Sequence, residues 1–149
     1  MVGTIHHHGI VVDDLEASVA FYVDHFDLEE EYRITAEPAG FGTLLGVDRP
    51  APAEIAFLRD ETGMRVELEE HTTAERTVDE LADPTDVGYA HLCFEVDDID
   101  ATYDELVAAG VEFVTRPGTA TDSGAHIVYC RDPSGNLLEL IELPDGPNE

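Results

Sequence analysis

Two histidines and two glutamates of this chain have the side chains and the placement to bind one metal ion. They are His7, Glu67, His91 and Glu139. Imidazole nitrogen and carboxylate oxygen suit Ni²⁺, Co²⁺, Zn²⁺, Mn²⁺ or Fe²⁺, and four protein ligands leave open positions in an octahedral shell. Open positions indicate a catalytic rather than a structural ion. A bound dication would also offset the repulsion between carboxylates that share a cavity.

The four residues occupy matching positions in a duplicated sequence. Residues 59–68 align without a gap with residues 131–140, and both segments end in Glu-Leu. Residues 7–15 align in the same way with residues 91–99, so each half opens with a histidine and closes with a glutamate. The histidines are 84 residues apart and the glutamates 72, which leaves 12 additional residues in the first half. Gly and Pro are frequent at residues 36–53, so we predict that the insertion is a loop there.

Periodicity and capping residues predict the same order of elements, β-α-β-β-β, in both halves. Asp13 and Asp14 precede the first predicted helix, and Gly110 ends the second. The first half has predicted strands at 5–12, 29–35, 54–59 and 64–70 and a helix at 15–26. The second half has predicted strands at 91–96, 112–115, 126–130 and 137–143 and a helix at 98–109. Between them, residues 71–86 are predicted to form a short helix and a linker.

Alternation along the strands predicts where the four side chains point. Residues 66–68 and residues 138–140 each place a glutamate between two apolar residues. Successive strand residues face opposite sides, so the apolar residues cover the helix and both glutamates face away from it. The same reasoning places both histidines on the non-helix face. If the sheets curl, each concave face gathers one histidine and one glutamate, and pairing of two modules brings the four together.

The charge of the chain is extreme. Thirty-four acidic residues face seven basic ones, all arginines, and the formal net charge is −27. Molar salt shortens the Debye length to about 3 Å and removes most of the self-repulsion, so the composition is typical of a protein from a salty cytoplasm. An ordinary acidic mesophilic protein is the alternative. Nucleic acid is not expected as a partner, because no basic patch is available to neutralise phosphates.

Membrane segments and disulfides are not expected either. The chain has no apolar run of about 18 residues and no signal-peptide pattern at its start, so we expect a cytoplasmic protein without a membrane span. Cys93 and Cys130 form no CxxC arrangement, and we interpret both as reduced core or cavity residues.

Three motifs resemble those of the vicinal oxygen chelate superfamily. They are the opening segment at residues 7–22, the segment at residues 91–99 and the closing Asp-Pro-Ser-Gly-Asn-Leu-Leu-Glu-Leu at residues 132–140. That superfamily holds glyoxalase I, methylmalonyl-CoA epimerase, extradiol dioxygenases, fosfomycin-resistance enzymes and metal-free bleomycin-binding proteins. The resemblance implies an α+β fold in which two tandem βαβββ modules with curved mixed sheets make a single glyoxalase-like domain. The modules would span residues 4–70 and 88–143, with a linker at 71–87.

The resemblance also implies that the four residues are the metal ligands. Their His/Glu/His/Glu order is most similar to that of bacterial glyoxalase I. Two positions depart from it: the glutathione-handling arginine four residues after the first ligand is Val11 here, and the asparagine four residues after the second is His71. The activity implied is that of a metal-dependent lyase or isomerase that acts on a small 2-oxo or 2-hydroxy compound, including a thiol adduct, through an enediolate. Glu139 is the first choice for the catalytic base and Glu67 the second.

Other functions are also compatible with this sequence, and several residues besides the four candidate ligands have expected roles. A metal-dependent epimerase, an extradiol dioxygenase and a non-catalytic small-molecule-binding protein are the alternative functions, and a homodimer with sites at the interface is expected. Three further histidines are expected at the surface or pocket rim: His25, His71 and His126. Three arginines are expected to pair with local acids: Arg33, Arg59 and Arg65. His126 and Arg131 are candidates for substrate contact.

Overall fold

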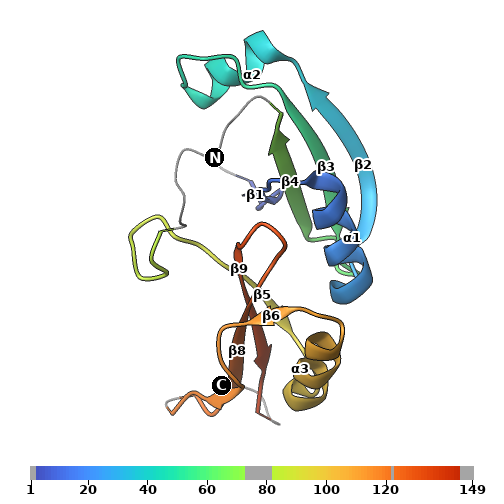
Figure 1. The fold of residues 1–149 in the computed structure, drawn as a ribbon, viewed down its shortest axis with the longest axis vertical. Helices are drawn as coiled ribbons and strands as arrows, with labels where there is room; N and C mark the ends of the chain where they lie inside the picture. Colours follow the sequence, from blue (N-terminus) through green and yellow to red (C-terminus); the bar gives the residue numbers. More distant parts are fainter. Residues whose placement is uncertain (1–2, 73–81, 122, 145–149) are drawn as a thin grey trace. The chain divides into compact units, whose positions relative to one another are not determined.

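The computed structural model describes residues 3–72, 82–121 and 123–144, and it divides into two compact units, residues 1–80 and 81–149 (Figure 1). Each unit is described by itself. Unit 1 contains β1 (His8–Val11), α1 (Leu15–Phe26), β2 (Glu29–Ala36), α2 (Pro38–Leu45), β3 (Ala53–Arg59) and β4 (Arg65–His71). Unit 2 contains β5 (Leu92–Glu95), α3 (Ile99–Ala108), β6 (Glu112–Phe113), β7 (Gly118–Thr119), β8 (His126–Arg131) and β9 (Leu137–Glu142).

Both units have the same sheet topology. The strand order is β1-β4-β3-β2 in unit 1 and β5-β9-β8-β6 in unit 2, with β7 also paired to β8. In each unit the first strand runs parallel to the last, and the other pairings are antiparallel. The α+β fold with two curved mixed sheets and the repeated β-α-β-β-β order are therefore confirmed.

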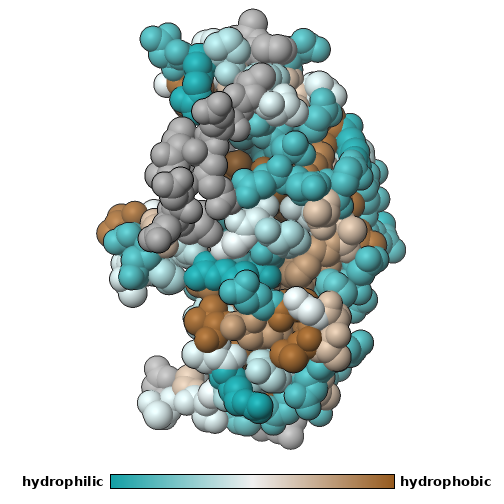
Figure 2. All heavy atoms as spheres, viewed as in Figure 1, coloured by the Kyte–Doolittle hydropathy of each residue, from teal (hydrophilic) through white to brown (hydrophobic). Residues whose placement is uncertain are grey.

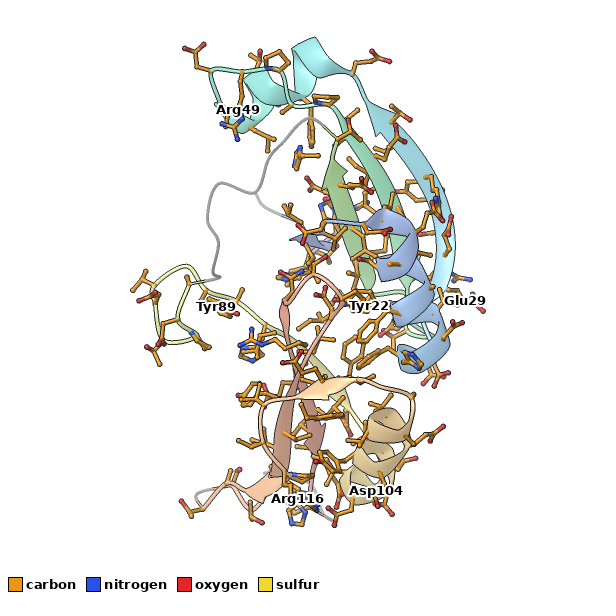
Figure 3. The ribbon with its side chains drawn as sticks, viewed as in Figure 1. Tyr22, Glu29, Arg49, Tyr89, Asp104 and Arg116 are labelled. Carbon is orange, nitrogen blue, oxygen red and sulfur yellow. The ribbon has the colours of Figure 1, made fainter. Side chains whose placement is uncertain are left out.

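The helices α1 and α3 each cover one face of the sheet of their own unit. The buried residues of α1 include Leu15, Val19, Tyr22 and Phe26, and Tyr22, labelled in Figure 3, is 0% exposed. This stripe packs against β3, which has an apolar run at residues 55–58, and against β4, where the apolar Val66 and Leu68 alternate with charged residues. In unit 2, α3 packs against β8 and β9. Burial of these apolar faces is the main favourable contribution to folding of each unit.

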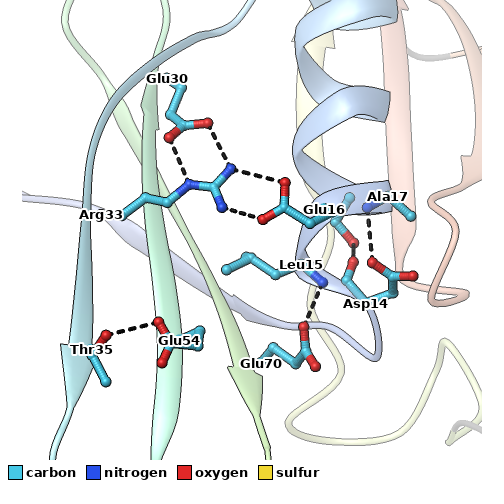
Figure 4. Close-up of polar contacts among 10 residues, drawn as sticks. Asp14, Leu15, Glu16, Ala17, Glu30, Arg33, Thr35, Glu54 and Glu70 are labelled. Carbon is cyan, nitrogen blue, oxygen red and sulfur yellow. Dashed lines mark hydrogen bonds and ion pairs between the residues drawn. The ribbon is translucent and has the colours of Figure 1, made fainter.

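Two carboxylates bind the amide groups at the start of α1, and two more bind those at the start of α3. Asp14 Oδ1 accepts a hydrogen bond from Ala17 N at 2.9 Å, and Glu70 Oε2 accepts one from Leu15 N at 2.8 Å (Figure 4). The duplicate arrangement in unit 2 uses Asp98, which accepts from Ala101 N at 2.9 Å, and Glu142, which accepts from Ile99 N at 2.7 Å. In each unit the two carboxylates accept hydrogen bonds from amide groups that have no partner within the helix. Their negative charges also interact favourably with the positive end of the helix dipole.

The Glu142→Ala variant is therefore expected to lower the free energy of unfolding by about 1–2 kcal/mol, because the amide of Ile99 loses its acceptor. Urea denaturation measures the change. Glu112→Ala, on the exposed start of β6, is the matched control and should change stability by less than about 0.5 kcal/mol. Equal losses in the two variants would contradict the capping role of Glu142.

The duplicated Arg-Asp segments form the tight turns that join the last two strands of each unit. Asp60 Oδ1 accepts hydrogen bonds from the amides of Thr62 and Met64. Asp132 Oδ1 accepts the equivalent bonds from Ser134 and Asn136. The glycines of the two turns have φ angles of 89° and 88°, a left-handed conformation that favours glycine. The most obvious repeat in the sequence thus sets the register of the strands that carry the glutamates.

The prediction that residues 36–53 form a loop is wrong, because this segment contains α2. The helix begins with Pro38 at a position where proline is favoured and ends at Gly46, whose φ is 72°. Gly42 is required by packing, since a Cβ there would lie 2.3 Å from the carbonyl oxygen of Arg49. Two of the glycines that suggested a loop therefore have roles in the helix: Gly46 caps its end, and Gly42 allows the backbone of Arg49 to lie close to it. In unit 2, the short strand β7 was also not predicted.

The surface agrees with the acidic composition. Hydrophilic side chains predominate along β2 on the face that Figure 2 shows, whereas the area over α1 also carries apolar side chains. None of the helices formed by the described residues has the length and apolar character that a bilayer crossing requires. The predicted short helix within residues 71–86 falls largely on residues 73–81, which lie outside the described residues.

Candidate metal centre

Each candidate glutamate lies on a central strand, next to the strand that follows its histidine. Glu67 of β4 pairs with Gly9 of β1, and Glu139 of β9 pairs with Cys93 of β5. The residues that flank the two glutamates are buried: Val66, Leu68, Leu138 and Leu140. The glutamates consequently face away from the helix in both units, as strand alternation predicts.

In unit 1, His7 and Glu67 are brought together. Nε2 of His7 lies 3.0 Å from Oε2 of Glu67, whose side chain is only 12% exposed. The edge of the imidazole contacts Phe57 of β3, with 5.4 Å between ring centroids. Nδ1 of His7 lies 2.7 Å from Nδ1 of His6. A hydrogen bond at Nδ1 fixes the orientation of the ring and leaves Nε2 turned toward the carboxylate.

In unit 2, His91 and Glu139 form the equivalent pair. Nε2 of His91 lies 2.8 Å from Oε2 of Glu139, and Glu139 is buried. The edge of the imidazole contacts Tyr129 of β8 at 5.6 Å between centroids. Tyr129 pairs with Glu139 across the sheet as Phe57 pairs with Glu67. Both units therefore build a histidine, a glutamate and an aromatic ring from equivalent strands.

The geometry of both pairs fits two neighbouring ligands of one cation. Donors about 2.1 Å from a metal are about 3.0 Å apart when they occupy adjacent octahedral positions. The observed separations are 3.0 and 2.8 Å, distances that a hydrogen bond also satisfies. Within each unit, the described residues contain no group of three or more His, Cys, Asp or Glu side chains arranged to hold a metal. Each unit thus offers two ligands of the right chemistry.

The Glu67 carboxylate is destabilised as an anion. A Cβ on Gly9 would lie 3.3 Å from Oε2 of Glu67 and 3.5 Å from Oε1 of Glu69, so this glycine makes room for two neighbouring carboxylates. Burial, a hydrogen bond with Glu69 and the charge of Glu69 raise the pKa of Glu67 from 4.5 to about 7. A cation beside Glu67 would reverse this destabilisation.

The Glu139 carboxylate has neutral neighbours instead. Burial and the adjacent Glu139 raise the pKa of the Cys93 thiol to about 12, and the same two causes raise the pKa of Tyr129. Both groups hydrogen-bond with Glu139, and both stay protonated at neutral pH. Cys93 and Cys130 are free thiols, of which Cys130 is buried and Cys93 lies on the same face as Glu139. The two glutamates therefore differ in the groups that surround them.

A second His–Glu pair was not predicted. Oε2 of Glu69 lies 3.3 Å from Nε2 of His71, and their side chains are 15% and 16% exposed. Both residues follow Glu67 on the same face of β4, because they are two and four residues further along the strand. The ring of His71 stacks on Phe41 of α2 at 5.9 Å between centroids. Strand alternation at residues 65–71 was the signal that could have found them.

The arginines are engaged locally, as predicted for three of them. Arg33 binds Glu16 and Glu30 on the helix side of the sheet (Figure 4). The other two arginines of the prediction also form ion pairs: Arg59 with Glu29 and Arg65 with Glu31.

Arg131 and His126, the two candidates for substrate contact, have partners within unit 2. Arg131 donates hydrogen bonds to the hydroxyl of Tyr89, labelled in Figure 3, and to the carbonyl of Gly135. His126 pairs with Glu142 and shares the helix side of β8 with the buried Val128 and Cys130, so it does not face the same way as Glu139.

Comparisons with known proteins agree with this architecture. A 2-epi-5-epi-valiolone epimerase from an Actinomyces species is 35% identical over 148 residues, which is 95% of this chain and 80% of that protein. A probable lactoylglutathione lyase from Vibrio parahaemolyticus is 27% identical over 94% of this chain and 91% of its own length. The crystal structure of a glyoxalase family protein from Bacillus cereus superposes with a TM-score of 0.81 at 26% identity and covers 97% of both chains. The family model for the Glyoxalase/Bleomycin resistance protein/Dioxygenase superfamily matches residues 4–140, so the chain belongs to this superfamily.

Proposed function

We propose that the two His–Glu pairs together hold one divalent cation and that the protein is a metal-dependent isomerase of the epimerase type. The observation that carries the proposal is the duplication of the pair: equivalent strands of the two units present the same two ligands, at 3.0 and 2.8 Å. One unit alone supplies two ligands, fewer than the three protein ligands of an ordinary catalytic site. The substrate class proposed is a small 2-hydroxy ketone.

The names of the relatives support an enzyme of this superfamily and leave two activities to compare. One relative is named as an epimerase and another as a probable lactoylglutathione lyase. A glyoxalase-type lyase acting on a thiol adduct is therefore the second candidate. We favour the epimerase type because Val11 and His71 stand at the two positions where the resemblance to glyoxalase I implies glutathione-handling residues.

Proton transfer is proposed to involve both glutamates. A bound divalent cation would supply positive charge to two adjacent substrate oxygens, which lowers the cost of removing the proton between them. Glu139 is the proposed base that takes this proton from the hydroxyl-bearing carbon, and Glu67 is the second candidate. Tyr129 and Cys93 hydrogen-bond with Glu139 and would orient its carboxylate. Glu67 would return a proton to the opposite side of that carbon, and it can hold this proton only when it is released from the cation, because a bound cation lowers the pKa of the carboxyl group.

Solvent deuterium exchange tests the proposal. The protein is loaded in turn with Ni²⁺, Co²⁺, Zn²⁺, Mn²⁺ or Fe²⁺ and incubated in D₂O with 2-hydroxycyclohexanone or its pentahydroxylated relative scyllo-inosose. NMR is expected to show loss of the proton on the hydroxyl-bearing carbon, and a chelator should abolish the exchange until metal is restored. Glu139→Gln, whose amide group cannot take the proton, is expected to slow the exchange by about 10²–10⁴-fold. Exchange that survives the chelator would contradict the proposal, and oxygen consumption with a catechol would indicate a ring-cleaving oxygenase instead.

A further inference from the structure

The Glu69–His71 pair belongs to one module only. A shift of 72 residues relates Glu67 to Glu139, and the same shift relates Glu69 to Ile141 and His71 to Leu143. The second unit therefore has apolar residues where the first has a carboxylate and an imidazole. A cation held equally by both units explains the duplicated pairs, but it does not explain a polar pair that is present once.

This pair lies beside an apolar floor on the same face of unit 1. Ala53, Ile55 and Phe57 form a buried cluster against which Phe41 packs. Ile55 pairs with Glu69, and Phe57 pairs with Glu67. The floor continues to the edge strand β2, where the ring of Tyr32 stacks on Phe57 at 4.6 Å and remains 40% exposed. Because Ala53, Ile55 and Phe57 are only 1–5% exposed, the ring of Tyr32 is the part of this floor against which the carbon face of a small ring can stack.

Charge on this face disfavours an anionic ligand. Arg59 and Arg65 are the arginines of β3 and β4, and each is already ion-paired, with Glu29 and Glu31. Among the described residues of β4, the positions beyond Arg65 on this face carry Glu67, Glu69 and His71. A carboxylate or phosphate placed over the apolar floor would meet two acids and no uncommitted arginine of these strands. Hydroxyl groups are different, because a carboxylate accepts their hydrogen bonds and an imidazole can donate or accept.

We propose that Glu69 and His71 form a specificity subsite that binds hydroxyl groups of an uncharged, polyhydroxylated ketone. The inference rests on the proposed function, since the reacting carbon would lie at the His7–Glu67 pair. Residues two apart on a strand are separated by about 6.6 Å. That separation allows one ring to present its reacting oxygens at Glu67 and a distant hydroxyl at Glu69. Phe41, stacked on His71, would fix the imidazole for this contact.

The test compares binding of two ketones that share the reacting group. Titration calorimetry on the metal-loaded protein measures Kd for scyllo-inosose and for 2-hydroxycyclohexanone, which lacks the distant hydroxyls. The wild type is expected to bind scyllo-inosose about 10- to 100-fold more tightly. The double variant Glu69→Ile, His71→Leu imports the residues of unit 2 and should abolish this preference without loss of metal. Glu69→Gln, which preserves the shape of the side chain, should reduce the preference, and His126→Ala should retain it.

The outcomes separate the subsite from the activity. A preference that survives in the double variant would overturn the subsite, as would a wild type that binds the hemithioacetal of glutathione and methylglyoxal more tightly than scyllo-inosose. A wild type that shows no preference between the two ketones would also overturn it. Absence of deuterium exchange together with a preference that depends on Glu69 and His71 would uphold the subsite and refute the proposed reaction.

Discussion

The His91→Ala variant is expected to lose metal-dependent deuterium exchange, with a decrease on the order of 10³-fold. The physical reason is that each unit supplies only two ligands, so removal of one imidazole leaves Glu139 without its partner at 2.8 Å. The variant should also lose stabilisation by metal. A ligand present at 100 times its Kd stabilises a folded protein by about 2.7 kcal/mol, which thermal unfolding with and without metal detects.

A matched control and a mixing experiment sharpen this prediction. His126→Ala removes an exposed histidine from the helix side of β8 in the same unit and should leave exchange and metal stabilisation unchanged. If sites form across a homodimer, mixing His7→Ala with His91→Ala protein should restore part of the exchange, because one intact pair comes from each chain. No recovery after subunit exchange would contradict the dimer-interface arrangement, and full exchange by His91→Ala alone would contradict the shared site.

The Glu67→Gln variant is expected to be more stable than the wild type without metal, and more so as the pH rises. The folded-state pKa of Glu67 is raised to about 7 from 4.5, so between these values the folded state binds more protons than the unfolded state. The contribution of Glu67 to the free energy of unfolding therefore falls as the pH rises from 4.5 to 7. Glutamine has no proton to lose, and the advantage of the variant should grow by on the order of 2 kcal/mol between pH 5 and pH 8.

Urea denaturation of metal-free protein at both pH values measures this difference. Glu61→Gln, in the exposed turn between β3 and β4, is the control for the loss of one negative charge and should show a smaller change with pH. Metal should reverse the order, because a ligating carboxylate must be deprotonated and the variant cannot supply one. An advantage of Glu67→Gln that does not change with pH would show that burial and Glu69 do not destabilise the charged form.

Local sequence rules predicted most of the fold because each rule corresponds to a contact that the structure contains. The helix at residues 15–26 begins after Asp14, which accepts a hydrogen bond from Ala17, and the second helix is followed by Gly110 with a φ of 90°. The helix α2 was not predicted, because the need for Gly42 arises from the backbone at Arg49, which no local pattern reveals.

The residues of the candidate site were also predicted only in part. Duplication and strand alternation predicted that His7 faces Glu67 and His91 faces Glu139 within their units. The Glu69–His71 pair was missed because it has no counterpart in the second half and lies in an acidic run. The aromatic rings of Phe57 and Tyr129 were not singled out, although both stand two residues before a duplicated Arg-Asp pair. Comparison of the two halves therefore identifies residues that both modules share, and it does not identify residues that are present in one module only.

Metal counting by native mass spectrometry tests the shared site most directly. The wild type, saturated with one of the candidate metals and freed of excess ion, is expected to carry one ion per chain. The double variants His7→Ala, Glu67→Ala and His91→Ala, Glu139→Ala should each carry none, since the remaining pair from a single unit supplies only two ligands. Two ions per wild-type chain, or one ion retained by either variant, would show that the pairs bind independently and would contradict a common metal centre.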